Sequence, residues 1–337
     1  MADAVLAPAD QTTDRVDGIS AVVPVHRSEA ILPLLIARLT TALEALATAH
    51  EIILVDDGSP DRSWAVIADA ASHDDRIHGI RLMRNFGQHN ALLVGIRKAR
   101  YPLIVTLDDD LQNPPEEITH LLARLTPDVD VVYGTPVSEQ HSLWRSAASR
   151  ITKYALEEAM GATAARSVSA FRLFRTDLRG AFERYQSPDI SIDVLLTWAT
   201  TRFAVVNVRQ EPRAGGQSGY TFGRLVHHAL NMMTGFTTRP LRIASLVGFL
   251  FTIFGAVVFI VVVVRSFAAG DSVPGFPFLA SIIAVFAGVQ LLILGIMGEY
   301  LARMHLRLLE RPPYVVAETT PVEPHPPQQR DARRTTP

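Results

Sequence analysis

Two long apolar runs near the C-terminal end constrain the fold of this chain more than any other feature. Ile243–Val264 contains no charged residue, and the only strongly polar side chains of Phe276–Gly298 are Ser281 and Gln290. Each run reaches the roughly 20 residues that a helix needs to cross the hydrocarbon core of a bilayer. Two buried core helices of a soluble domain are the alternative, but paired runs of this length are typical of membrane spans. We therefore predict two transmembrane helices, over 243–264 and 276–298.

Basic residues flank the pair of runs on both outer sides. The only charged residues in the loop between the two runs are Arg265 and Asp271. The flanking residues are Arg239, Arg242, Arg303, Arg307 and Arg311. Because short loops rich in Lys and Arg stay on the cytoplasmic side, both termini are predicted to be cytoplasmic. The sequence thus predicts a multi-pass protein of the inner (cytoplasmic) membrane whose remaining domain faces the cytoplasm.

The composition excludes several classes of site. The chain has no cysteine, which rules out disulfide scaffolds, thiolate zinc sites, iron–sulfur clusters and a cysteine nucleophile. The formal net charge is −2, so the electrostatic footprint of a nucleic-acid-binding protein is absent. We expect no nucleic-acid partner.

Short apolar runs alternate with longer periodic stretches in the first part of the chain. The expected strands are 19–23, 51–55, 77–82, 103–107 and 129–133, and the expected helices are 30–47, 63–71, 90–99 and 116–125. Strands that alternate with helices predict βαβ units and a mostly parallel, Rossmann-like α/β sheet. Further along, 144–160 favours a helix, 168–174 and 203–208 favour strands, and 190–199 is apolar.

Composition also suggests how the chain is divided. The expected parts are a disordered leader (1–18), a catalytic domain (19–221), an amphipathic helix along the membrane interface (222–240), the two spans, a juxtamembrane helix (299–316) and a disordered tail (317–337). The interface helix is predicted from an apolar stripe at helical spacing. The tail from Pro312 is rich in Pro, Arg and Thr, which is typical of disorder.

Two acidic clusters follow predicted strands. Asp56-Asp57-Gly58-Ser59 ends one strand, and Asp108-Asp109-Asp110-Leu111-Gln112 ends another. In an open α/β sheet, ligands bind at the carboxyl ends of the strands. Mg²⁺ commonly uses one or two carboxylates together with substrate phosphates, and side chains two apart on an extended segment share a face. Turn formation and the acidic start of a helix are the alternatives.

These clusters, on this fold and with two C-terminal spans, carry a resemblance. The chain resembles family 2 glycosyltransferases of the GT-A fold, and more closely the membrane-anchored polyprenyl-phosphate glycosyltransferases. That group includes dolichyl-phosphate mannose synthase, the bactoprenol glucosyltransferases and undecaprenyl-phosphate aminoarabinose transferase, the nearest match. The resemblance covers about residues 19–316. Its segments are 84–89, 107–117, 144–149, 213–220, 237–241 and 298–300.

The resemblance implies roles for particular residues. Asp108, Asp110 and Gln112 would form the site for Mg²⁺ or Mn²⁺, with Asp108 and Asp110 also catalytic. Pro24, His26, Asp56, Asp57 and Asp109 would bind the nucleotide sugar. The acceptor phosphate would be held by Arg145, Ser149, Arg172, Arg213, Ser218 and Tyr220, with Arg145 also catalytic. Arginine suits this task because its guanidinium can bind phosphate with two hydrogen bonds.

Two positions depart from the pattern of that family. Its members usually have Asn-Glu after the aromatic residue that matches His26, whereas Arg27 and Ser28 stand here. They also often carry an arginine soon after the Gly-Thr that ends the fifth strand, where this chain has Pro136 and the residues after it.

The implied activity is inverting transfer of one sugar from a nucleoside-diphosphate sugar, by resemblance a UDP-sugar, to undecaprenyl or decaprenyl phosphate, for modification of cell-envelope glycans or lipids. The resemblance also implies a homo-oligomer, often a tetramer. The alternatives are a processive polysaccharide synthase of the same superfamily and a non-catalytic membrane scaffold. The former carry a Gln-x-x-Arg-Trp motif, which the string 140–145 lacks. The sugar, the nucleotide and the prenyl length stay open.

Overall fold

The protein alternates strands and helices from its first described residues. The computed structural model describes residues 15–136, 168–183, 185–186, 190–212, 239–269, 276–309 and 312–320. The first elements are β1 (Ile19–Val25), α1 (Leu32–Leu46), β2 (His50–Asp56), α2 (Ser63–His73), β3 (Ile77–Leu82), α3 (Gln88–Lys98) and β4 (Leu103–Thr106). They are followed by η1 (Pro115–Glu117), α4 (Ile118–Arg124) and β5 (Val131–Pro136). The expected α/β fold is confirmed.

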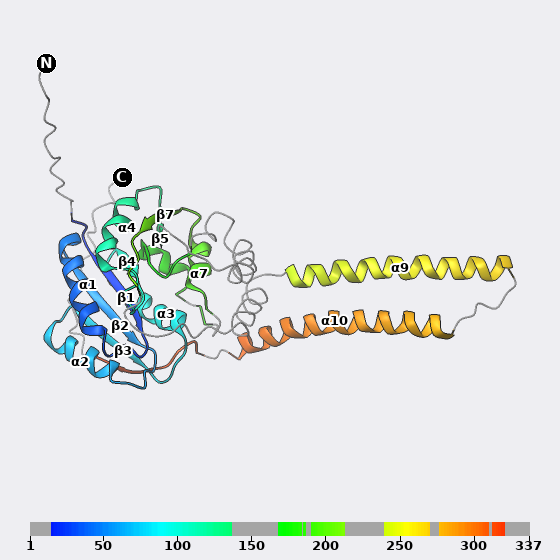
Figure 1. The fold of residues 1–337 in the computed structure, drawn as a ribbon, viewed down its shortest axis with the longest axis horizontal. Coiled ribbons are helices and arrows are strands. Elements are labelled where there is room, and N and C mark those ends of the chain that lie inside the picture. Colours follow the sequence, from blue (N-terminus) through cyan, green and yellow to red (C-terminus); the bar gives the residue numbers. More distant parts are fainter. Residues whose placement is uncertain are drawn as a thin grey trace, which may run out of the picture.

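A single eight-stranded sheet organises the described part of the domain. Its later elements are β6 (Arg172–Arg175), η2 (Thr176–Ala181), α7 (Ile192–Ala199), β7 (Phe203–Val208) and β8 (Val316–Thr319). The strand order is β7-β5-β6-β4-β1-β2-β3-β8. The central strands β4, β1, β2 and β3 are parallel, whereas β6 and β8 pair antiparallel with their neighbours. Figure 1 shows the helices packed around this sheet.

Both faces of the sheet are covered, which explains why its strands are apolar almost throughout. On β1, Ala21 and Val23 belong to a buried cluster with Leu35 of α1, and this cluster also takes in α2 and α4. Val22 points to the opposite face, where it belongs to a second cluster with Leu93 of α3 and side chains of α7. The period-2 alternation of a strand thus supplies two separate cores.

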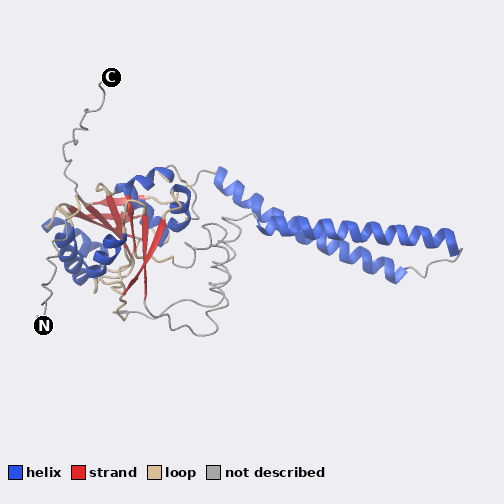
Figure 2. Cartoon of the chain, turned by 90° about the horizontal axis from the view of Figure 1, so that it is seen from above, coloured by secondary structure: helices blue, strands red, loops and turns tan. Residues whose placement is uncertain are grey.

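The helical pair α9 (Arg239–Ala269) and α10 (Phe276–Leu308) extends away from the sheet (Figures 1 and 2). The two helices pack side by side, with the ring of Phe251 edge-on to that of Phe286 at 5.8 Å. Of the described residues, one helix is long and apolar enough to cross a membrane by length and composition. Its window is Leu241–Val258, with a mean hydropathy of 2.1 and 6% of its residues buried. The shorter apolar stretch of α10 is Phe286–Ala302, and both membrane spans stay predictions.

The C-terminal part differs from its two expectations: the helix predicted over 299–316 ends with α10 at Leu308, and the first residues of the tail predicted to be disordered form a strand. Residues 316–319 form β8, which pairs antiparallel with β3 at the edge of the sheet. The backbone N–H of Met83 donates to the carbonyl of Val315 at 2.9 Å, and that of Gly79 donates to Oγ1 of buried Thr320 at 2.9 Å. Local composition gave no hint of this strand, because its hydrogen-bond partners lie more than 200 residues earlier in the sequence. Several predictions fall on residues outside the described ranges: residues 1–14 of the predicted leader (1–18), the predicted helix 144–160, residues 222–238 of the predicted interface helix (222–240) and residues 321–337 of the predicted tail.

A buried carboxylate links the amino ends of the central strands, at the edge of the sheet opposite to the predicted ligand site. Glu51 of β2 accepts hydrogen bonds from the hydroxyl of Ser20 (2.6 Å), the backbone of Arg100 (2.7 Å) and its Nε (2.7 Å). His78 Nε2 lies 3.4 Å away. Burial alone would raise the pKa of Glu51, but the hydrogen bonds from His78, Ser20 and Arg100 outweigh burial and lower it.

We expect Glu51→Gln to destabilise the protein by about 2 kcal/mol at neutral pH, the scale of hydrogen bonds to a charged group. A carboxylate whose folded-state pKa is lowered stabilises above its unfolded pKa, and this contribution disappears as the pH falls through the folded value. The difference in thermal midpoint between the variant and the wild type should therefore narrow below about pH 4.5. Glu44→Gln, which changes an exposed partner of Arg76, is the control. A constant difference across pH 3–7 would contradict the assignment.

Candidate active site

The candidate site lies where the carboxyl ends of β1, β2 and β4 meet. In the sheet, β1 lies between β2 and β4. The chain continues from β1 to β2 on one side, and β4 pairs with β1 on the other side. In doubly wound folds, ligands bind at such a reversal of strand order. Three segments follow the strand ends: 26–28 after β1, 57–59 after β2 and 107–112 after β4. The predicted acidic clusters therefore do come together.

Asp109 joins the segment after β1 to the segment after β4. Its Oδ2 accepts the backbone N–H of His26 at 2.9 Å and the hydroxyl of Ser28 at 2.5 Å. Burial raises the pKa of Asp109, while the hydrogen bonds from Ser28 and His26 act in the opposite direction. The side chain thus contacts the β1 loop, and Ser28, one of the departures noted in the sequence, forms part of that contact.

Both loops contain a residue with left-handed backbone conformation. Arg27 has φ 60° and Leu111 has φ 56°. Such conformations cost on the order of 1–3 kcal/mol for residues other than glycine and need support from their surroundings. The side chain of Leu111 is buried in the core beneath the site, which supplies that support. The segment after β4 is therefore a tight turn and not the extended strand from which we expected alternate side chains to share a face.

Two of the predicted metal ligands, Asp108 and Asp110, accept hydrogen bonds from neighbouring residues. The backbone N–H of Gln112 donates to Oδ1 of Asp110 at 3.1 Å, and Gln88 Nε2 donates to Oδ1 of Asp108 at 2.5 Å. Among the described residues, no group of three or more His, Cys, Asp or Glu side chains is arranged to hold a metal ion. The donor set of Asp110, Gln112 and Asp108 consists of hard oxygens and fits a cation whose coordination is completed by substrate phosphates.

Asp56 and Asp57, predicted to bind the nucleotide, are both buried and organise the adjacent loops. Asp57 accepts the backbone N–H groups of Phe86 (2.7 Å) and Gly87 (2.9 Å), and burial raises its pKa against these two hydrogen bonds. Asp56 Oδ1 accepts the backbone N–H of Ser59 at 3.1 Å. Their direct contact with a ligand stays a prediction.

The other predicted nucleotide residues lie beside them. Pro24 is buried within β1, whereas His26 is exposed above the sheet. Nδ1 of His26 lies 3.2 Å from the carbonyl oxygen of Asp57 and 3.4 Å from Nδ2 of Asn85. An exposed ring held between two loops is well placed to flank a planar ligand. Gln88 was not assigned a role from the sequence, although its motif follows β3 and so enters the same edge of the sheet.

Arg172 departs from its expected role. We expected it to contact the acceptor phosphate, but its side chain is 1% exposed and forms an ion pair with Asp193 of α7. Its Nε also donates to the hydroxyl of Thr106 at 2.9 Å, and the hydroxyl of Tyr133 donates to Asp193 at 3.1 Å. A guanidinium committed to these partners supports the strands beneath the site. The remaining predicted acceptor residues lie outside the described residues: Arg145, Ser149, Arg213, Ser218 and Tyr220.

Two solved structures are among the chains to which this chain is similar. Glucosyl-3-phosphoglycerate synthase from Mycobacterium tuberculosis, in complex with Mn²⁺, uridine diphosphate and glucosyl-3-phosphoglycerate, is 17% identical. The match covers 66% of this chain and 78% of that chain, with a TM-score of 0.48. Mannosyl-3-phosphoglycerate synthase from Rubrobacter xylanophilus is 16% identical over 67% of this chain and 74% of that chain, with a TM-score of 0.48.

Comparison of sequences identifies the family. Residues 20–180 match the model of glycosyl transferase family 2. The undecaprenyl-phosphate 4-deoxy-4-formamido-L-arabinose transferase of Pseudomonas aeruginosa (strain LESB58) is 35% identical over 317 residues, covering 92% of each chain. The protein of the same name from Salmonella choleraesuis (strain SC-B67) is 35% identical over 303 residues, covering 89% of this chain and 93% of its own. The chain belongs to glycosyl transferase family 2 and is a glycosyltransferase of GT-A-like fold.

We expect the contact between Ser28 and Asp109 to fix the segment after β1 relative to the turn after β4, both of which are predicted to contact the sugar donor. Ser28→Ala removes a hydrogen bond to a carboxylate, so we expect the KM for the sugar donor to rise about three- to tenfold. Steady-state kinetics of Ser28→Ala, Asp109→Ala and the double variant should show non-additive effects, because the two residues act together.

The control for this prediction is Ser72→Ala, which removes an exposed hydroxyl that bonds only within α2. Two outcomes would show that the position of the two loops does not depend on this contact. These are additive effects of Ser28→Ala and Asp109→Ala, or a donor KM for Ser28→Ala equal to that of the control.

Proposed function

We propose that the protein transfers a single sugar from a nucleoside-diphosphate sugar to a polyprenyl phosphate, with inversion at the anomeric carbon. The proposal rests on the position of the turn 108–112. The side-chain oxygen atoms of this turn, which are suited to bind a metal ion, lie at the edge of the sheet beside the loop after β1. The similarity to the two transferases named above, which extends over about nine-tenths of the chain, supports the acceptor class.

The lipid phosphate is the nucleophile in this reaction. Its oxygen forms a bond to the anomeric carbon while the bond from that carbon to the donor diphosphate breaks, and the nucleoside diphosphate leaves. A phosphate monoester has a second pKa near about 6, so at neutral pH it is mostly dianionic and needs no strong general base. The main task of the protein is therefore to hold two anionic groups together in an orientation suited to displacement.

In this proposal, one group of residues binds the sugar donor and another group binds the lipid acceptor. On the donor side, Asp110 and Gln112 would hold Mg²⁺ or Mn²⁺ together with Asp108, and the cation supplies Lewis-acid neutralisation of the leaving diphosphate. Asp109 keeps this turn against the β1 loop. On the acceptor side, we assign Arg145, Ser149, Arg213, Ser218 and Tyr220 to the lipid phosphate, since arginine and hydroxyl groups are its natural hydrogen-bond donors. Arg172 is left out because of its burial.

The helical pair gives the catalytic domain access to a lipid acceptor in this proposal. Many large apolar side chains of α9 and α10 are exposed in the protein alone, among them Phe249, Leu250, Ile283 and Leu291. Exposed apolar surface of this extent needs a partner such as lipid. We propose that both helices span the cytoplasmic membrane, with both termini in the cytoplasm, and that the chain forms a homo-oligomer.

A lipid-product assay tests the reaction. The full chain in mild detergent with Mn²⁺ or Mg²⁺ receives undecaprenyl phosphate and a panel of labelled UDP-, GDP- and dTDP-sugars. We expect one donor to label the lipid, and chelation of the cation to stop the labelling. Asp110→Asn should lower kcat/KM at least about 100-fold, because it weakens stabilisation of the departing charge.

The matched control is Asp69→Asn, which changes an exposed carboxylate on α2. Labelling of the lipid by wild type and Asp69→Asn but not by Asp110→Asn supports the proposal. Donor hydrolysis without any labelled lipid would overturn the acceptor assignment, and equal activity of Asp110→Asn and wild type would overturn the donor-side assignment.

A further inference from the structure

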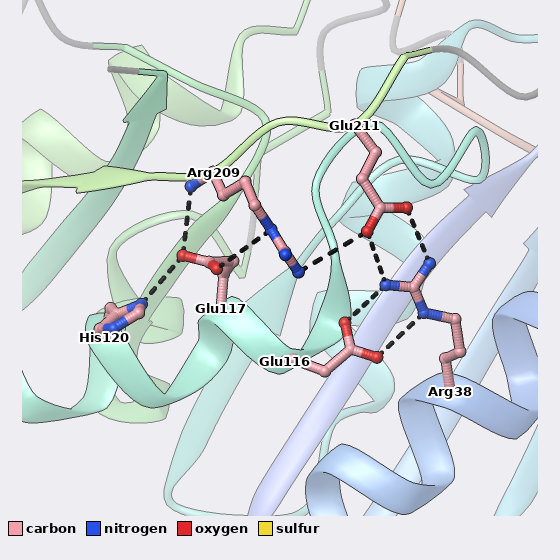
Figure 3. A network of polar contacts seen from close by, with 6 residues as sticks. All are labelled: Arg38, Glu116, Glu117, His120, Arg209 and Glu211. Atoms are coloured by element: carbon pink, nitrogen blue, oxygen red, sulfur yellow. Dashed lines mark hydrogen bonds and ion pairs between the residues drawn. The ribbon is translucent and has the colours of Figure 1, made fainter.

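A network of charged side chains lies beside the turn 108–112, which contains the proposed metal ligands. The network joins three parts of the chain that are far apart in sequence (Figure 3). Arg38 of α1 contacts Glu116 of η1 through Nε (2.9 Å) and Nη2 (2.7 Å). The same guanidinium contacts Glu211, which follows β7, through Nη1 (3.0 Å) and Nη2 (3.1 Å). One guanidinium thus forms two-point contacts with two carboxylates.

The segment that carries Glu211 is docked along the turn after β4. The backbone N–H of Glu211 donates to the carbonyl of Gln112 at 2.9 Å. The backbone N–H of Arg209 donates to Glu117 at 3.2 Å, and Nε2 of Gln210 lies 3.4 Å from Oδ1 of Asn113. Consecutive residues 209–211 therefore contact the part of the chain that contains a proposed metal ligand.

Charge explains why this docking depends on Arg38. The hydrogen bonds from Arg38 are the largest cause of the lowered pKa of both Glu116 and Glu211, so both are ionised at neutral pH. The negative charge of Glu116 opposes ionisation of Glu211, which means that the two carboxylates repel each other when nothing lies between them. Arg209 adds a weaker contact, with Nη2 at 3.7 Å from Glu211. Removing Arg38 leaves two like charges at the place where the segments meet.

We propose that Arg38 is a positioning residue that holds the segment 209–212 against the turn 110–117 and so sets the acceptor side of the site relative to the donor side. The proposal rests on the function proposed above, in which Arg213, Ser218 and Tyr220 bind the acceptor phosphate. That stretch of sequence begins directly after Pro212, so a displacement of 209–212 is passed to it through the chain.

An ordinary surface ion pair is the competing explanation, since exposed salt bridges contribute little on their own. The chain offers a matched control for it. Arg76 contacts Asp74 through Nε and Nη2 and Glu44 through Nη1, with distances of 2.7–3.2 Å. Its partners lie on α1 and just before β3, and none belongs to the segments after β4 or β7. Arg38→Ala and Arg76→Ala remove the same kind of group from the two networks.

Amide hydrogen exchange tests the docking without reference to catalysis. In the full chain in detergent, we expect Arg38→Ala to speed exchange of peptides that cover 207–212 at least about tenfold, because the N–H groups of Arg209 and Glu211 lose their partners. Exchange in β1–β3 should stay unchanged, and Arg76→Ala should leave 207–212 unchanged. Unchanged exchange at 207–212 in Arg38→Ala would overturn the proposal, whether or not the protein makes a lipid product.

Kinetics test the consequence for the reaction. We expect Arg38→Ala to lower kcat about tenfold and to raise the KM for polyprenyl phosphate, with the donor KM changed less than about twofold. Arg38→Lys keeps the charge but loses the planar fork, so it should recover only part of the activity. Because Arg38 acts through Glu211, a cycle of Arg38→Ala and Glu211→Gln should be non-additive.

The outcomes separate the two proposals. If the wild type makes no lipid-linked sugar, the proposed function fails, and the exchange experiment alone decides whether Arg38 holds the segment. If the wild type makes product and Arg38→Ala has the kinetics of Arg76→Ala, the positioning role is wrong and the proposed function stands. The positioning role of Arg38 would also be wrong if Arg38→Ala raised the donor KM and the acceptor KM equally and left kcat unchanged.

Discussion

The candidate site depends on one contact between two loops, the carboxylate of Asp109 against the backbone of His26 and the hydroxyl of Ser28. Adjacent parallel strands place their carboxyl ends side by side, but they do not determine how the following loops lie. At this position both loops contain a residue of left-handed conformation, Arg27 or Leu111, and neither loop is part of the regular sheet. The partly buried carboxylate of Asp109, with hydrogen-bond donors from the other loop, links the two turns.

Much of the fold could be predicted from the sequence because its signals are local. The alternation of apolar runs identified β1 to β5, and β7 was predicted with its observed bounds. β6 is shorter than its predicted run, and 190–199, which is only apolar in sequence, contains the helix α7. β8 could not be foreseen, because a four-residue edge strand is selected by the partner strand to which it pairs and not by its own composition.

For the site, too, features with a local signal in the sequence could be predicted, and features that depend on distant residues could not. The clusters at 56–59 and 108–112 were found because acidic residues after strands are conspicuous, and the structure brings them to one edge of the sheet. The roles of individual residues were harder to predict. Arg172 looks like a phosphate ligand in sequence, but its neighbours Thr106, Tyr133 and Asp193 come from three other elements and make it part of the core. Arg38 is one charged residue on an amphipathic helix, and its partners, 78 and 173 residues away, give no local signal.

The return of the chain from α10 to β8 has a mechanical consequence. The helical pair is joined to the catalytic domain at both of its ends: the chain leaves the domain before α9, and after α10 it is hydrogen-bonded along β3. The hydroxyl of Tyr314 also accepts a hydrogen bond from Arg97 of α3 at 3.1 Å. A body attached by one flexible link can swivel about it, whereas a body attached by two links is confined to hinge-like tilting. The covalent path of the chain thereby restricts the angle between the catalytic domain and the helical pair.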